Sequence, residues 1–138
     1  MIKRIPLVHQ AGVLKSYFPD SKIVRFGEME IRWTHAVKPS PLSATYTLHL
    51  RYKVGSGADI YVLSPSPLKL AKGKTKLPHV YSTPKQKLCL YYPEAKEWAP
   101  SMYYAKSLIP WACEWLVHYE LWLATGDWKG GGIEHHDE

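Results

Sequence analysis

The sequence predicts one α+β domain, an α/β sandwich in which an antiparallel β-meander packs against helices. Apolar residues recur at helical spacing near both ends of the chain, and between those segments they alternate with polar residues. The length of 138 residues suits a single domain. With 46% hydrophobic residues, the chain is able to build a core of its own.

An opening helix is predicted over residues 7–18. Its apolar residues fall at spacings of three and four, the period of a helix with one buried side. Pro19 and Asp20 end the pattern. The apolar positions are Leu7, Val8, Ala11, Leu14, Tyr17 and Phe18.

Strands are predicted where the period changes to two. Apolar or aromatic residues alternate with polar ones over residues 31–35 and 46–52, and residues 60–63 follow a Gly-Ser-Gly turn at 55–57. Consecutive strands joined by short turns form an antiparallel meander with one solvated face. The Ser-Pro-Ser-Pro segment at 64–67 is expected to end the sheet.

Residues 64–100 contain six of the eleven prolines and have little periodicity. So long a segment without regular structure tends to be functional in a compact domain, and we expect the chemistry to lie there. Beyond it, apolar residues at helical spacing predict a helix over residues 101–123 that ends by Gly126. Pro110 marks a break or a fresh first turn. The aromatic stripe of this helix is interpreted as packing, and we expect no cofactor.

No apolar run reaches the roughly 18 residues that a membrane-spanning helix needs. The chain is therefore expected to be soluble and cytoplasmic, with no membrane partner. Cys89 and Cys113 are expected to be free thiols, because one disulfide is too few for a stapled secreted scaffold. Residues 1–138 are expected to form one domain, with a flexible glycine-rich tail at about 130–138.

The net charge of +6 is unevenly distributed along the chain. Residues 1–88 hold 15 Lys and Arg against 4 Asp and Glu, whereas residues 89–138 hold 3 against 8. This asymmetry indicates either an acidic partner, protein or nucleic acid, or a solvated basic face.

One cysteine in the proline-rich segment has a distinctive neighbourhood. Cys89 lies between two leucines, ten residues after His79, and a Trp-Ala-Pro follows at 98–100. In this order, after a helix and a strand meander and before a further helix, the residues resemble the ubiquitin-conjugating enzyme (E2) family over nearly the whole chain. The resemblance implies the UBC fold, with Cys89 as the catalytic residue.

The C-terminal part carries a narrower resemblance. It resembles the prokaryotic branch of that fold, in particular the stand-alone E2 of type II (short) CBASS antiphage systems. The residues that carry this resemblance are Trp111, residues 114–116, residues 119–120, Trp122 and the Thr-Gly-Asp-Trp-Lys-Gly at 125–130. That resemblance implies a thioester between Cys89 and the C-terminus of a cGAS/DncV-like nucleotidyltransferase. It further implies transfer of this passenger to a lysine amine of a target protein.

The chain departs from the family at the tripeptide that precedes the cysteine. Where the family has His-Pro-Asn, this sequence has His79, Val80 and Tyr81. The asparagine donor is therefore replaced, and the phenolic OH of Tyr81, His79 or a loop amide is the candidate to stabilise the tetrahedral intermediate. We expect Cys89 to be the sole catalytic residue, and His79, Tyr81 and Trp98 to support the active-site loop.

Other residues with reactive side chains are given structural or electrostatic roles. Cys113 is expected to be a structural thiol of the closing helix, and no metal site is expected, because neither cysteine belongs to a Cys-x-x-Cys pair. A cationic surround favours a thiolate. The lysines expected near Cys89, or against a partner, are Lys69, Lys72, Lys74, Lys76, Lys85 and Lys87.

The proposed chemistry leaves activation to another protein, and two rival functions remain. A 138-residue chain has no room for an adenylating domain, so activation is expected from a separate protein or from the partner. A non-catalytic UBC-fold binding module fits the missing asparagine, although the retained cysteine argues against it. A basic nucleic-acid-binding accessory protein fits the lysine-rich first part, but most aromatic residues occupy core positions instead of a stacking platform.

Overall fold

The computed structural model describes residues 3–92 and 96–130 and has an α+β fold. The predicted strand meander and both predicted helices are present. The elements follow in the order α1 (Leu7–Tyr17), β1 (Lys22–Phe26), β2 (Glu30–Val37), β3 (Tyr46–Lys53), β4 (Gly57–Ser64), β5 (Val80–Ser82), β6 (Lys87–Leu88), the short 3-10 helix η2 (Tyr104–Lys106) and α2 (Leu108–Thr125).

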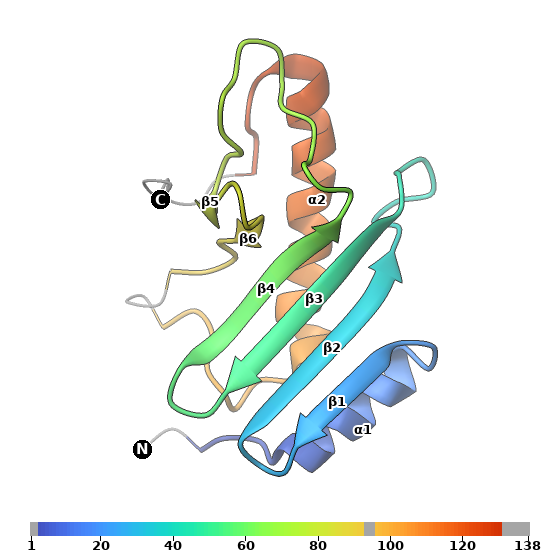
Figure 1. The fold of residues 1–138 in the computed structure, drawn as a ribbon, viewed down its shortest axis with the longest axis vertical. Coiled ribbons are helices and arrows are strands. Elements are labelled where there is room, and N and C mark those ends of the chain that lie inside the picture. The colour runs from blue at the N-terminus through green and yellow to red at the C-terminus, as the bar shows by residue number, and fades with distance from the viewer. Residues whose placement is uncertain (1–2, 93–95, 131–138) are drawn as a thin grey trace.

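The strands form one antiparallel sheet in the order β1-β2-β3-β4-β6-β5 (Figure 1). Strands β2, β3 and β4 are the predicted meander. Burial alternates along β3 as the period of two requires, because successive side chains of a strand point to opposite faces. Its buried residues are Tyr46, Leu48, Leu50 and Tyr52.

The sheet differs from the prediction in two ways: one strand was missed, and the expected end of the sheet was wrong. Strand β1 was not predicted, because among its residues only Ile23 is half-buried and the rest are exposed, so the strand has no apolar alternation. The segment at 64–67 ends β4 but not the sheet. Strands β5 and β6, inside the predicted loop 64–100, extend the sheet beyond β4, where Tyr61 pairs with Lys87. Strands of three and two residues are too short to show a period.

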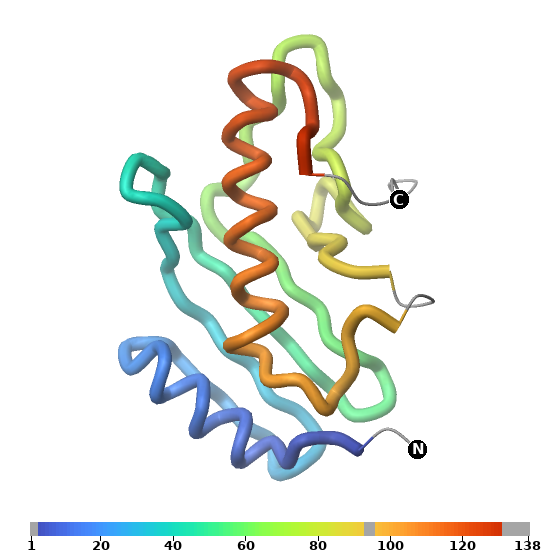
Figure 2. Tube along the Cα trace, turned by 180° about the vertical axis from the view of Figure 1, so that it is seen from behind, coloured from blue at the N-terminus to red at the C-terminus, as the bar shows by residue number. Residues whose placement is uncertain are grey.

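Both helices cover the same face of the sheet, and α2 runs along it (Figure 2). The core lies between these two layers, as apolar faces of sheets and helices require. Its largest fully buried side chains include Leu7 and Leu14 of α1, Trp33, Leu48 and Leu50 of the sheet, and Ile109, Leu116 and Tyr119 of α2.

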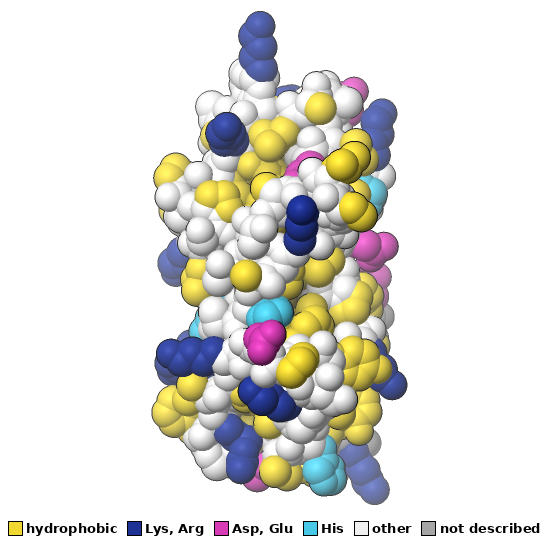
Figure 3. Space-filling view, turned by 90° about the vertical axis from the view of Figure 1, so that its right-hand side faces the viewer, with side chains coloured by type: hydrophobic (Ala, Val, Ile, Leu, Met, Phe, Trp, Pro, Cys, Tyr) yellow, Lys and Arg dark blue, Asp and Glu magenta, His cyan; other side chains and the backbone are white. Residues whose placement is uncertain are grey.

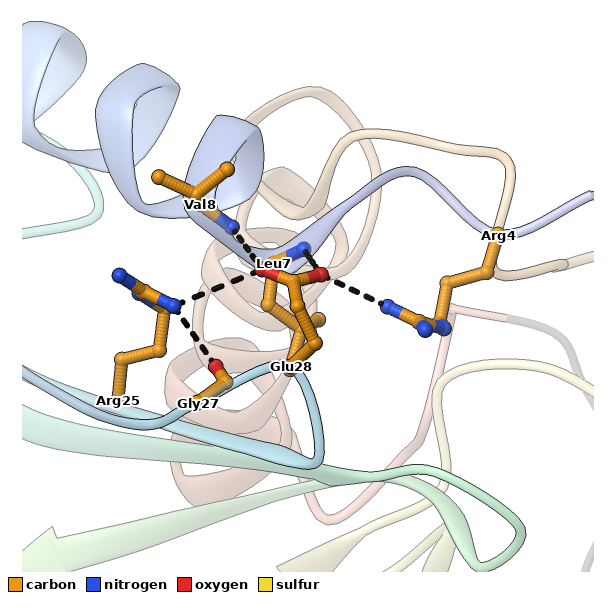
Figure 4. A network of polar contacts seen from close by, with 6 residues as sticks. All are labelled: Arg4, Leu7, Val8, Arg25, Gly27 and Glu28. Carbon is orange, nitrogen blue, oxygen red and sulfur yellow. Dashed lines mark hydrogen bonds and ion pairs between the residues drawn. The ribbon is translucent and has the colours of Figure 1, made fainter.

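A glutamate from the β1–β2 turn caps helix α1. The preceding proline offers no side-chain acceptor, and the Glu28 carboxylate accepts from the backbone N–H groups of Leu7 at 2.7 Å and Val8 at 3.0 Å (Figure 4). Arg4 and Arg25 pair with the same carboxylate. The hydrogen bond from Leu7 is the largest of the interactions that lower the pKa of Glu28.

Helix α2 begins later than predicted, at Leu108 instead of residue 101. The intervening residues form turns and η2, and Pro110 lies in the first turn, where its missing N–H is not needed. Gly126 ends the helix in the left-handed conformation with φ 79°. Within the described ranges, no helix has the length and apolar character needed to cross a membrane. Of the predicted tail at 130–138, all but Gly130 lies outside the described residues.

Candidate active site

A hairpin made by β5 and β6 presents Cys89. Val80 pairs with Leu88 across the hairpin, and one step further the Cys89 N–H donates to the His79 carbonyl at 3.1 Å. His79 and Cys89 are ten residues apart in the sequence, and this backbone hydrogen bond brings them together. Cys89 follows β6 immediately and is half-buried.

The hairpin is held to β4 by Gln86, a residue that the sequence did not single out. Its side-chain oxygen accepts from the Leu68 N–H at 2.6 Å, and its amide NH₂ donates to the carbonyls of Val62 at 2.8 Å and Pro65 at 3.0 Å. Gln86 is 3% exposed, and its backbone φ is 53°. A glutamine in a polar turn carries no sequence signal for such a role, because the role arises only when segments 62–68 and 86–88 meet.

His79 lies at the open end of the hairpin, opposite Cys89, and its backbone φ is 49°. Its carbonyl, besides the Cys89 N–H, accepts from Nε1 of Trp115 in α2 at 3.1 Å. Its ring lies 5.1 Å from the Trp128 ring, centroid to centroid. These contacts tie the cysteine-bearing hairpin to α2 and to the segment that follows it.

The structure brings Tyr81 to Cys89. Burial, the neighbouring Cys89 sulfur and a side-chain hydrogen bond between the two residues raise the pKa of Tyr81. The phenol therefore keeps its proton and is the donor to the sulfur. The thiol in turn donates to the Tyr91 carbonyl at 3.7 Å. The structure thus places Tyr81 next to the Cys89 side chain.

Trp98 lies farther from the sulfur, in an aromatic cluster. It is buried, its Nε1 donates to Ser107 Oγ at 3.2 Å, and its ring centroid lies 5.6 Å from that of Tyr91 and about 6.3 Å from those of Tyr52 and Tyr104. Trp98 therefore reaches the Cys89 segment through Tyr91, and it anchors that segment to the core.

A pocket of about 270 Å³ lies next to the β5–β6 hairpin, and its walls include Leu88 and Leu90, the chain neighbours of Cys89. Tyr81 and Tyr91, which both contact Cys89, line it. It also contains an ion pair, since Lys87 Nζ lies 3.3 Å from Asp59 Oδ1. The remaining lining comes from four residues at and just before the start of β4, from Leu88 and Leu90, and from Leu108, the first residue of α2. The four residues near β4 are Ser56, Gly57, Ala58 and Ile60.

The lysines expected to surround Cys89 differ in position. Lys87 is half-buried next to Cys89, and its Nζ lies 5.4 Å from the centroid of the Tyr81 ring. Residues 65–76 instead arch toward the C-terminal end of α2 (Figure 1), where the Tyr119 hydroxyl donates to the Lys69 carbonyl at 2.7 Å. Lysines 69, 72, 74 and 76 on this arch, and Lys85, are exposed.

Basic side chains are dispersed on the face of the molecule that Figure 3 shows. Lys and Arg lie scattered along its whole length, with uncharged, acidic and histidine side chains between them. A groove that tracks a nucleic-acid backbone needs a continuous basic stripe. This face has no such stripe.

Cys113 lies on α2, and burial raises the pKa of its thiol. A raised thiol pKa lowers the fraction of nucleophilic thiolate. Cys89 and Cys113 are not joined in a disulfide. In the part of the chain that the structure describes, no three His, Cys, Asp or Glu side chains are grouped so as to hold a metal ion.

The chain matches a known family. The family model described as "Type II CBASS E2 protein" matches residues 10–136, which include the hairpin, Cys89, the aromatic cluster and α2. A comparison with curated proteins found no match.

Proposed function

The chain belongs to the Type II CBASS E2 protein family, and we propose that it is a conjugating enzyme that carries a partner protein as a thioester on Cys89. The family assigns it an E2-like role in CBASS defence. The passenger is the C-terminus of the cGAS/DncV-like nucleotidyltransferase of the same system, and the acceptor is a lysine amine of a target protein. The whole chain acts as one domain, in the cytoplasm.

The observation that carries the proposal is the position of Cys89 beside Tyr81. Cys89 is half-buried at the end of β6, and Tyr81 hydrogen-bonds to it. A phenol that donates to sulfur favours the thiolate over the thiol, and the thiolate is the nucleophile. The thiolate attacks the activated carboxyl carbon, the activating group leaves, and a thioester forms.

Tyr81 has a second role once the carbonyl is attacked. Its OH then lies close to the oxygen that becomes negative, and a donor aimed at that oxygen lowers the barrier. His79 and Trp98 are positioning residues, because they hold the hairpin through α2 and the aromatic cluster. The carboxyl arrives already activated by another protein, since a free carboxylate has no leaving group to expel.

The test is co-expression of the chain with the nucleotidyltransferase and the other proteins of its system, followed by intact mass measurement without reductant. Wild type and Cys113→Ala are expected to carry an adduct of the partner's mass that thiols remove. Cys89→Ala is expected to lack it. An adduct that persists in Cys89→Ala, or equal co-purification of the partner with every variant and no adduct, contradicts the carrier function. The second result identifies a binding module.

A further inference from the structure

We infer that residues 126–130, which follow α2, form a clasp that positions the Cys89 hairpin, and that Trp128 and Gly130 are positioning residues for the chemistry of Cys89. This inference rests on the proposed function and adds to it a part of the chain that the function does not yet use. Both residues act through His79, at the open end of the hairpin.

The clasp turns back along α2. Gly126 ends the helix in the left-handed conformation, and Figure 2 shows the chain leaving that end and running back beside the helix. The ring of Trp128 therefore lies 5.7 Å, centroid to centroid, from the rings of Trp115 and of His118. These two residues are about three and two turns before the end of the helix.

Trp128 and Trp115 hold His79 from two sides. The His79 ring lies 5.1 Å from the Trp128 ring, with an angle of 30° between their planes. The Trp115 Nε1 donates to the His79 carbonyl at 3.1 Å, and the same carbonyl accepts from the Cys89 N–H at 3.1 Å. The clasp thus fixes the ring of His79, and α2 fixes its backbone.

The backbone of His79 needs this support. Its φ of 49° lies in a region that few residues other than glycine adopt. Such a conformation costs free energy and persists only where the surrounding structure imposes it. Loss of the contact from Trp128 should let His79 relax. The Cys89 N–H hydrogen bond would move with it, and so would Tyr81, two residues further along the hairpin.

Gly130 allows the clasp to close. A Cβ built at this position would lie 2.9 Å from Cδ2 of His118 and 3.0 Å from Cε2 of Trp128. The backbone crosses these two rings at a distance that only glycine permits. Any larger residue must push the clasp away from α2.

The His118 ring is held in this contact by packing. Among the residues that the structure describes, its buried Nδ1 has no hydrogen-bond partner. Trp115, His118, Trp128 and His79 therefore form a continuous series of ring contacts from the helix to the hairpin. A displacement at Gly130 is transmitted along it.

The consequence for the chemistry concerns the pairing of Tyr81 with Cys89. The phenol stabilises the thiolate only while the two strands of the hairpin keep their relative position, because a reactive group depends on the residues that support it. The clasp therefore contributes to the reactivity of Cys89 from a distance.

The experiment needs no partner protein. It measures the pH midpoint for alkylation of Cys89 by iodoacetamide, using peptide mass spectrometry, and the hydrogen-exchange rate of the Cys89 N–H, using NMR. Circular dichroism establishes that each variant is folded.

Trp128→Ala is expected to raise the midpoint by about half a unit and to speed the exchange about fivefold, as the loss of one aromatic contact predicts. Trp128→Phe keeps a ring and should restore most of both values. Phe18→Ala is the matched control. Phe18 is also half-buried, but its ring contacts are with α1 and β2, so both Cys89 values should stay unchanged.

Gly130→Ala tests the clasp without deleting any contact. It adds one methyl group and is expected to move both values in the same direction as Trp128→Ala. Gly12→Ala is its control, because a Cβ at Gly12 meets nothing within 4 Å. If Trp128→Ala does not fold, the comparison of these two glycine variants decides.

Equal values in Gly130→Ala and Gly12→Ala overturn the clasp, as does an effect of Phe18→Ala as large as that of Trp128→Ala. Faster exchange with an unchanged midpoint also overturns it, because the clasp would then not affect the chemistry. Neither measurement involves the partner, so absence of a partner adduct in the co-expression experiment counts against the carrier function alone.

Discussion

At the scale of single residues, the proposed chemistry depends on the pairing of Tyr81 with Cys89. Tyr81→Phe removes the OH that donates to the sulfur and leaves the ring in place. Hydrogen bonds to a charged group contribute about 1.5 to 3 kcal/mol, and 1.36 kcal/mol corresponds to one pH unit. We expect the midpoint of the pH profile for alkylation of Cys89 by iodoacetamide to rise by about one unit.

Peptide mass spectrometry of the alkylated protein measures that profile for each cysteine separately. Tyr17→Phe, on the exposed side of α1, is the matched control and should leave the Cys89 midpoint in place. A Tyr81→Phe midpoint equal to that of wild type would show that the phenol does not stabilise the thiolate.

The resemblance to a known family pointed to Cys89, His79, Tyr81 and Trp98 as one set. The structure shows that they lie at different distances from the cysteine in the chain of contacts. Tyr81 contacts Cys89, His79 lies opposite it in the hairpin, and Trp98 reaches it through Tyr91. Asp59 was not singled out. Its place in the pocket depends on β4 pairing with β6, a contact between residues far apart in sequence that no local pattern records.

At the scale of elements, the β5–β6 hairpin depends on one buried side chain. Gln86→Ala deletes three hydrogen bonds, those to the Leu68 N–H and to the carbonyls of Val62 and Pro65. Loss of a buried hydrogen bond costs about 1 to 3 kcal/mol, and we expect a loss of about 3 kcal/mol in the free energy of unfolding, measured with urea. The alkylation rate of Cys89 in the folded protein should change as well, because its hairpin loosens.

Gln10→Ala is a matched control for the hairpin. Gln10 is also buried, donates to the Met102 carbonyl and accepts from the Tyr104 N–H. It should therefore lower stability without altering Cys89 alkylation. If Gln86→Ala and Gln10→Ala alter that rate equally, Gln86 has no special part in holding the site.

The cap of α1 makes a pH-dependent contribution to stability. The pKa of Glu28 is lowered from 4.5, chiefly by the hydrogen bond from the Leu7 N–H. A carboxyl with a lowered folded-state pKa stabilises the fold above its unfolded pKa and loses this effect as pH falls through the folded value. Glu28→Gln should therefore lower the Tm at pH 7, by an amount that shrinks below pH 4.5.

Thermal melts across that pH range, with Glu114→Gln on the exposed side of α2 as the control, measure this difference. A gap between wild type and Glu28→Gln that stays constant down to the acid limit would show that the charge of Glu28 does not stabilise the cap.

Sequence periodicity predicted elements with a clear buried face and missed those without one. Strand β3 and helix α1 were predictable because their apolar residues follow one period. Strand β1 is almost wholly exposed, and β5 and β6 are very short. Strand β1 is held by its pairing with β2, and β5 and β6 are held by their pairing with each other and by the hydrogen bond from Gln86 to β4.

At the scale of the whole molecule, the helices and the sheet share one core. Buried side chains from α1, the strands, the aromatic cluster and α2 belong to a single cluster. We therefore expect two-state unfolding of one domain. Tryptophan fluorescence and far-ultraviolet circular dichroism should give coincident urea transitions. Two separated transitions would contradict a single domain.

The order of events on Cys89 tests the central claim, transfer of a partner by a cysteine carrier, most directly. After co-expression, lysate is pulsed with activated passenger, further loading is blocked, and quenched samples are analysed by tandem mass spectrometry. The account predicts that a thioester on Cys89 peaks first and decays at the rate at which the lysine amide grows. Growth of the amide while Cys89 remains unmodified would contradict it.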